Sequence, residues 1–404
     1  MITISKQPYR YAPTQNPMIF QFATNLTTTL YFSIEIKQAL TNKLLAKNKI
    51  YISPNQTGSF FDICKILDNV TSTPIDNSDS VLVHLDGTYG YYLSIKGIDA
   101  NGNVTDPLVT TETFYAFNGK LNNFDLFNGL MNSYFMKSGY EHKFLTDRPE
   151  LSNLHYVGKE HLYFLADNTS NILNATIIVN YRNNLADTYM VEFDNPNNKL
   201  LHRLNMSPRS LSEQLGFNMT NVKNIVVFLT DLDGVQCSAT QTYHIVNYSC
   251  KQSIANLNWI NEFGGMSSNT FISPKERKSV EKTSYYGNGY LERVNGVYQP
   301  FQRVLNTNIN NTYNITSQVL NDDEYDVITN IINSRNVYAE LITGELYPII
   351  LDTTSVDVLK KKYTKRHNRL QLDFTSNANL KLELFIVPQA IVNEGFDYFL
   401  DFIL

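Results

Sequence analysis

Apolar and polar side chains alternate with a period of two along much of this chain, in short runs separated by turn residues. Because successive side chains of a strand point to opposite faces of a sheet, this alternation predicts half-buried β-strands. Short strands broken by turns are typical of an all-β sandwich, which we predict for residues 1–116. Its clearest runs are 18–22, 30–34, 49–52, 81–85 and 91–98.

The run at 91–98 is followed by Asp99-Ala100-Asn101-Gly102-Asn103, in which Asn-Gly is a strong signal for a tight hairpin turn. The alternating acidic and amide side chains also imitate the start of a calcium loop. However, Gly102 comes too early and no Glu follows at the twelfth position. We therefore interpret the segment as a turn. With its preceding strand, it resembles the last hairpin of a fibronectin type III or immunoglobulin-like domain.

Residues 117–150 form a predicted connector. Apolar side chains recur there at spacings of three and four residues, including Leu121, Phe124 and Leu130, which predicts a short amphipathic helix. Such a stripe packs either on its own domain or on a neighbouring copy.

Residues 151–250 predict a second β-sandwich, with strand runs at 161–165, 175–181, 189–193, 225–229 and 242–246. Asp231-Leu232-Asp233-Gly234 lies between two of these runs. Although two aspartates suggest a metal ligand set, Asp-Gly after an apolar strand is a hairpin signal, and we interpret it as a turn.

Residues 251–404 predict a strand-rich, ring-forming domain with one helix. Asn321 is a good N-cap, acidic residues follow it, and Tyr325 and Ile328 begin an apolar face. A polar stretch at 273–293 predicts an extended loop or hairpin arm. A hairpin is expected around Thr343-Gly344, between strands at 337–341 and 346–350, and two more strands are expected near 369–374 and 380–387. The predicted fold class is therefore mainly β: two tandem immunoglobulin/fibronectin-like β-sandwiches followed by an α+β domain with one helix.

Composition excludes several classes of protein. Charged residues make up only 18% of the chain and the net charge is −5, which disfavours a dedicated nucleic-acid binder. The N-terminus lacks an apolar signal core, and no apolar run approaches the roughly 18 residues of a membrane span, so we expect a soluble protein with no membrane partner. Cys64, Cys237 and Cys250 lack metal-binding or disulfide-framework spacing, so we expect reduced thiols.

Motifs of known chemistry are missing as well. The seven histidines are scattered, and the chain has no GxSxG elbow, P-loop or GxGxxG after a strand. We predict no catalytic residue, no cofactor and no metal site, and expect that the protein is not an enzyme.

One charged run stands out, at 360–369. Its basic side chains are Lys360, Lys361, Lys362, Lys365, Arg366 and Arg369. On the inner wall of a ring, such a run would face DNA in transit. Alternatively, it docks on an acidic neighbour, or it is only a solvated hairpin turn.

The most informative stretch is 250–271, which holds the only tryptophan. Trp259 lies in an apolar run that ends at Gly264-Gly265, and we predict that it is a core residue of a strand. The Leu-x-Trp-Ile-Asn strand closed by Gly-Gly resembles structural proteins of tail and neck assemblies in Bacteroidetes phages, including crAss-like phages. Phe144-Leu145-Thr146-Asp147-Arg148-Pro149 resembles the same group. Elsewhere the likeness is only architectural, to tail-tube domains that close into rings.

This resemblance implies a non-enzymatic virion structural protein of a phage tail or neck, synthesised in the bacterial host cytoplasm. It implies a homo-oligomeric ring that connects or extends the DNA conduit. The expected partners are other copies, other tail or neck proteins and, transiently, genomic DNA in the lumen. The alternative is a carbohydrate-binding adhesin or decoration protein on the virion surface, whose sandwiches would expose Tyr and Trp platforms.

Overall fold

The computed structural model describes residues 1–122, 133–137, 139, 141–246, 253–286, 293–298, 302–318, 320, 322–353, 369–376 and 381–384. The chain forms two compact units. Unit 1 comprises Met1–Val246 and Ile260–Ser267, and unit 2 comprises Asn247–Trp259 and Ser268–Leu404. The fold is mainly β, as predicted, and no helix in the described part of the chain is long and apolar enough to cross a lipid bilayer.

Unit 1 begins with a β-sandwich. One sheet has the order β1 (Ile2–Lys6), β3 (Ile19–Thr24), β6 (Gly58–Asp62). The other has the order β2 (Tyr11–Pro13), β10 (Phe114–Phe117), β8 (Thr88–Ile98), β4 (Tyr31–Gln38), β5 (Leu44–Tyr51), and β9 (Val104–Thr110) also pairs with β8. A short helix, α1 (Cys64–Asp68), follows β6. The alternation in β4 buries Phe32, Ile34 and Ile36 in the core between the sheets.

The predicted turn between β8 and β9 is confirmed. Gly102 has a φ of +85°, and one carboxylate oxygen of Asp99 accepts hydrogen bonds from the backbone N–H groups of Asn101 and Asn103. The Asp99 carboxylate therefore caps the turn.

A second sandwich follows in unit 1. Its larger sheet has the order β11 (Leu151–His155), β17 (Gln241–Val246), β16 (Val222–Asp231), β13 (Ile172–Tyr181), β14 (Ala186–Glu192). Its smaller sheet has the order β12 (His161–Leu165), β15 (Leu201–Asn205), β7 (Leu82–Leu85). Helix α3 (Pro208–Leu215) and two 3-10 turns, η2 (Asn168–Ser170) and η3 (Met219–Asn221), connect the strands.

One strand run does not lie in the sandwich to which its position in the sequence assigns it. Residues 81–85 were expected in the first sandwich, but β7 pairs antiparallel with β15, with Leu85 opposite Leu201 and His84 opposite His202. Alternation predicts that a segment is a strand, but it carries no information about which strand becomes its neighbour.

The Asp231–Gly234 segment is a turn, as predicted. Gly234 has a φ of +75°, and a side-chain oxygen of Asp231 accepts the backbone N–H groups of Asp233 and Val235. Of the predicted connector helix, residues 123–132 lie outside the described residues. The flanking side chains of Leu121, Tyr134 and Met136 are buried.

Unit 2 is built on a closed barrel of six strands. Its order is β18 (Ile254–Ile260), β19 (Met266–Tyr286), β22 (Gln302–Ser317), β25 (Gln371–Ser376), β24 (Leu346–Leu351), β23 (Val337–Glu340). Helix α4 (Asp322–Thr329) and the 3-10 turn η4 (Asn330–Asn333) supply Tyr325, Ile328 and Ile331 to the core. Trp259 is fully buried in that core, as predicted.

The predicted hairpin of β23 and β24 is confirmed, and Gly344 in its turn has a φ of +84°. The strand expected at 369–374 corresponds to β25. Of the segment expected at 380–387, only residues 381–384 are described, and Leu384 forms a single bridge with Leu341.

Candidate assembly site

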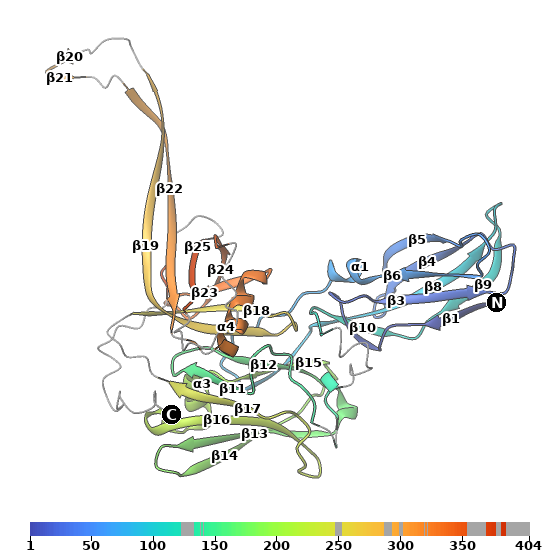
Figure 1. The fold of residues 1–404 in the computed structure, drawn as a ribbon, viewed down its shortest axis with the longest axis horizontal. Coiled ribbons are helices and arrows are strands. Elements are labelled where there is room, and N and C mark those ends of the chain that lie inside the picture. The colour runs from blue at the N-terminus through green and yellow to red at the C-terminus, as the bar shows by residue number, and fades with distance from the viewer. Residues whose placement is uncertain are drawn as a thin grey trace. The chain divides into compact units, whose positions relative to one another are not determined.

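The longest strands of unit 2 extend beyond its barrel. Figure 1 shows β19 and β22 running side by side, away from the other strands of that unit. The β22 strand pairs with β25 only as far as Thr312, which lies opposite Thr375. It pairs with β19 much further, down to Gln302 opposite Tyr286. We call this two-stranded extension, residues 278–286 and 302–311, the arm.

The arm is exposed on both faces. Every side chain from Lys275 to Thr283, and every one from Val304 to Ile309, is exposed. Val280 and Ile309 lie directly opposite each other and are 45% and 41% exposed. Two-stranded hairpins are marginally stable alone in water, so a ribbon with exposed aliphatic residues gains from a partner surface.

The arm is also basic. Residues 274–317 contain six basic and three acidic side chains, in a chain whose net charge is −5. Glu276 pairs with Lys381, with 3.9 Å between the charged atoms. Within the described part of the chain, Lys275, Arg277, Lys278 and Lys282 form no ion pair. Four cations are therefore available to a binding partner.

A small hairpin lies at the far end of the arm. It pairs β20 (Arg293–Val294) with β21 (Val297–Tyr298) around Asn295 and Gly296, whose φ angles are +49° and +80°. Positive φ at both central residues is typical of a type I′ turn. Val297 and Tyr298 are 64% and 63% exposed.

An extended loop or hairpin arm was expected at 273–293, but its returning strand was not. The signals were present, since Asn-Gly marks the tip and Val304, Ile309 and Tyr313 are β-favouring residues in a Thr/Asn-rich segment. Asparagine disfavours strands, and five asparagines between 306 and 314 masked the alternation.

A second surface of unit 2 carries two adjacent carboxylates. Asp373 in β25 points outward beside Asn314, whose side-chain amide donates to it at 2.6 Å. Asp352, just after β24, lies next to it, because the backbone N–H of Asp352 donates to the carbonyl of Asp373 at 2.8 Å. Partial burial and the nearby charge of Asp373 raise the pKa of Asp352. Within the described residues neither carboxylate has a cationic partner.

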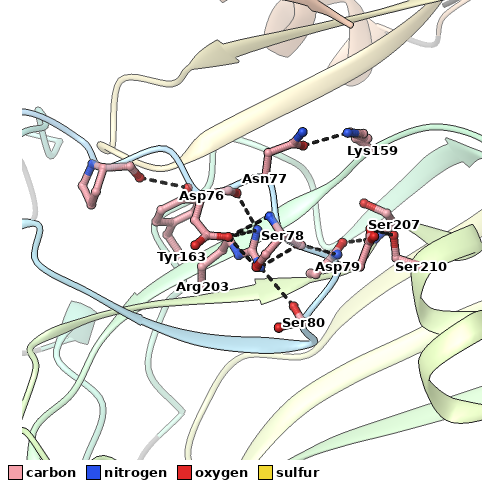
Figure 2. A network of polar contacts seen from close by, with 12 residues as sticks. Asp76, Asn77, Ser78, Asp79, Ser80, Lys159, Tyr163, Arg203, Ser207 and Ser210 are labelled. Carbon is pink, nitrogen blue, oxygen red and sulfur yellow. Dashed lines mark hydrogen bonds and ion pairs between the residues drawn. The ribbon is translucent and has the colours of Figure 1, made fainter. Parts of the chain in front are cut away.

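In unit 1, a buried arginine holds the segment that connects the two sandwiches (Figure 2). Arg203 of β15 has a fully buried side chain, and its guanidinium lies 3.1 Å from the carboxylate of Asp76. It also donates to the backbone carbonyls of Ser78 at 3.1 Å and Ser80 at 3.0 Å, and to that of Asp76. The planar guanidinium has five N–H donors, so a single Arg can donate hydrogen bonds to several carbonyls at once.

Further contacts extend this polar network, as Figure 2 shows. The Lys159 ammonium donates to the side chain of Asn77 at 2.7 Å, and the Ser210 hydroxyl donates to Asp79 at 2.9 Å. The Tyr163 hydroxyl donates to the carbonyl of Pro74 at 3.4 Å. These contacts fix residues 74–80 against β12, β15 and α3, so the network is structural: it positions β7 as an edge strand.

Most of the predicted basic run lies outside the described residues. Lys360, Lys361, Lys362, Lys365 and Arg366 belong to that part, and Arg369 is exposed just before β25. Among the described residues there is no group of three or more side chains suited to hold a metal ion. Cys64 and Cys237 carry free thiols, and Cys250 lies outside the described residues.

No family model and no curated protein matches this chain. Among solved structures, the crystal structure of CBD12 from CALX1.2 is 9% identical with a TM-score of 0.19, over 61% of this chain and 99% of that chain. The structure of Dpr2 Ig1-Ig2 in complex with DIP-Theta Ig1-Ig3 is 8% identical with a TM-score of 0.15, over the same shares. Similarities at these scores carry no argument about function.

Proposed function

We propose that this protein is a non-enzymatic structural component of a phage tail or neck, which assembles as a ring of identical copies around the DNA conduit. The observation that supports it is the arm, a basic two-stranded ribbon rooted in a closed barrel and exposed on both faces. Contacts between different surfaces of identical copies close into rings when the rotation between copies permits it.

The arm fits this role because its two strands make few contacts with the rest of their own copy. Beyond Thr312, its strands pair only with each other among the described residues. Its aliphatic and cationic side chains point to solvent, where they contribute little to the stability of their own barrel. Docking on a neighbour buries the aliphatic groups and places carboxylates near the cations.

The resemblance of Leu257–Asn261, Gly264-Gly265 and Phe144–Pro149 to tail and neck proteins of Bacteroidetes phages adds to this proposal. It also supplies the partners: other copies, other virion proteins and genomic DNA in the lumen. In that arrangement, the basic run at 360–369 faces either the DNA or an acidic neighbour.

A carbohydrate-binding adhesin is the second candidate. Tyr51 and Phe60, on β5 and β6 of the first sandwich, are 60% and 68% exposed, and exposed aromatic rings bind sugar faces. Trp259 does not serve as such a platform, because it is fully buried. Binding to a glycan array that Tyr51→Ala and Phe60→Ala abolish would favour this function.

Removing the arm tests the ring. Replacing residues 279–310 by Asn-Gly joins Lys278 to Asn311, which lie opposite each other, and leaves the barrel strands intact. We expect the parent to sediment as a closed oligomer and the deletion to sediment as a monomer with an unchanged circular dichroism spectrum. A shorter deletion, replacing 287–301 by Asn-Gly, keeps the paired strands of the arm and serves as the control. An oligomer that survives the longer deletion would refute the role of the arm.

A further inference from the structure

The arm carries a pattern on one face that the sequence alone does not reveal. Lys278, Val280 and Lys282 alternate along β19, so their side chains lie on the same face of the ribbon. Ile309 is directly opposite Val280 and shares that face. We call this set the arm face: an aliphatic pair with a lysine about 7 Å away on either side along the strand.

The barrel carries a matching pattern on its outside. Ile350 in β24 is 49% exposed and lies opposite Thr375 of β25. Asp352 follows two residues later on the same side, with Asp373 beside it. We call Ile350, Asp352 and Asp373 the wall patch. Ile350 and Asp352 are two residues apart along their strand, as Val280 and Lys282 are in the arm face.

One copy does not bring these two surfaces together. Ile309 and Tyr313 of β22 are four residues apart, so their side chains lie on the same face of the strand. Tyr313 belongs to the barrel core. The arm face is therefore a continuation of the inner face of the barrel sheet. Asn314 lies between the buried Tyr313 and Ile315, so its side chain is on the outer face of the sheet. Asp373 lies directly opposite Asn314, so the wall patch is on that outer face. The two surfaces therefore face opposite sides of one continuous sheet.

We propose that the arm face of one copy docks on the wall patch of a second copy, with Val280 and Ile309 against Ile350 and with Lys278 and Lys282 beside Asp352 and Asp373. The proposal rests on the proposed ring and names the receptor surface within it. The contact joins two different surfaces of identical chains, so each copy offers both a free arm and a free patch until the ring closes.

Charge favours this occupant over others. Residues 312–404, the part of unit 2 that follows the arm in the sequence, contain thirteen acidic and eight basic side chains. The arm has the opposite balance, so two copies attract each other arm to barrel and repel arm to arm.

A charge swap between two full-length variants tests the pairing. The first variant, Lys278→Glu with Lys282→Glu, places acids on the arm face. The second, Asp352→Lys with Asp373→Lys, places bases on the wall patch. We expect each variant alone to self-associate at least tenfold more weakly than the parent in analytical ultracentrifugation. Mixed in equal amounts, they should associate again, at least as pairs, because the arm of each variant then meets a patch of opposite charge on the other.

The control reverses two exposed charges on strands of unit 1. Lys96→Glu with Lys223→Glu makes the same change in net charge outside both proposed surfaces, and it should weaken self-association much less. Since Asp373 accepts a hydrogen bond from Asn314, the single change Asp352→Lys serves as a milder variant. Tryptophan fluorescence checks that each barrel is folded, because Trp259 lies in its core.

The possible results separate this inference from the proposed function. Restoration in the mixture supports the pairing. If both charge variants assemble like the parent while the arm deletion is monomeric, the wall patch is not the receptor and the ring proposal stands. The same conclusion holds if mixing the two variants gives no association beyond that of each variant alone. If the arm deletion itself still forms the oligomer, both proposals are wrong.

Discussion

The Nδ1 atoms of His84 and His202 lie 2.7 Å apart across the pairing of β7 with β15. The Nε2 atom of His202 donates to the carbonyl of Ala166 at 3.1 Å, which leaves its Nδ1 as an acceptor. His84 therefore donates to His202, and this contact requires a neutral His202. Burial lowers the pKa of His202 to about 3 and also lowers the pKa of His84.

This pair predicts that unit 1 loses stability in acid. The folded-state pKa of His202 is about 3, below its usual value of 6.5, so between these values the unfolded chain binds more protons than the folded one. We expect the free energy of unfolding to fall as the pH drops through this window. His202 alone should contribute about 1 kcal/mol per pH unit. Urea titrations followed by circular dichroism at pH 7, 6 and 5 measure this slope.

Replacing His202→Phe should reduce the slope, because it removes one group that titrates. Part of the slope should remain, since burial also lowers the pKa of His155 to about 3. Phe164→Leu is the packing control, because the Phe164 ring lies 5.0 Å from that of His202 and does not titrate. It should lower stability equally at every pH. An unchanged slope in His202→Phe would contradict the assignment.

Removing Arg203 should be costly to the stability of unit 1. Truncation to Ala leaves the carbonyl of Ser80 without its side-chain donor and Asp76 without its ion pair. The carbonyl of Ser78 keeps only the 3.4 Å hydrogen bond from the Asn205 amide. A buried acceptor that loses its donor costs roughly 1–3 kcal/mol, and the loss of several contacts at once should place Arg203→Ala at the upper end of that range. Thermal unfolding measures the loss, and limited proteolysis should detect new cleavage within residues 74–80.

Arg209 provides the comparison for Arg203. It forms an exposed ion pair with Glu213 at 3.1 Å on α3, and such pairs contribute less than about 1 kcal/mol. Arg209→Ala should leave both the melting temperature and the protease pattern nearly unchanged. Equal effects of the two substitutions would show that the network in Figure 2 does not anchor the segment.

Trp259 should report on the barrel alone. It is the only tryptophan, it is fully buried, and it packs in the core of unit 2. Truncation to Ala should cost roughly 3–5 kcal/mol through the cavity it leaves. Fluorescence of the parent should follow the unfolding of unit 2, while circular dichroism follows both units. Emission typical of water-exposed indole in the folded protein would contradict the burial.

The turn at Gly264 should tolerate no side chain. Gly264 has a φ of +89°, and a Cβ built there would lie 1.7 Å from the carbonyl oxygen of Asn118. Gly234 has a similar φ of +75° with nothing within 4 Å of its Cβ position. Gly234→Ala should therefore cost about 1–2 kcal/mol for its backbone conformation alone. Gly264→Ala should cost more than twice as much in a urea titration, and equal losses would show that Asn118 moves away easily.

The local pattern of the sequence determined what each segment is. Alternation in Tyr31–Gln38 and Gln241–Val246 predicted strands and their buried faces, because a strand has a side-chain period of two wherever it lies. The turns at Asn101-Gly102 and Asp231–Gly234, and α4, followed from residues within a few positions of one another. The apolar surroundings of Trp259 predicted its burial.

Only the tertiary structure decided which segments meet. Whether residues 82–85 join the first or the second sandwich depends on a partner strand more than 100 residues away, and period-two alternation is the same for either choice. The register that places Val280 opposite Ile309, and the opposite sides on which the arm face and the wall patch lie, arise from pairing between distant strands. Arg203 reads as an ordinary cation in the sequence and becomes an anchor only because residues 74–80 cross over it. Local chemistry sets the shape of each segment, while long-range hydrogen bonding and packing choose its neighbours.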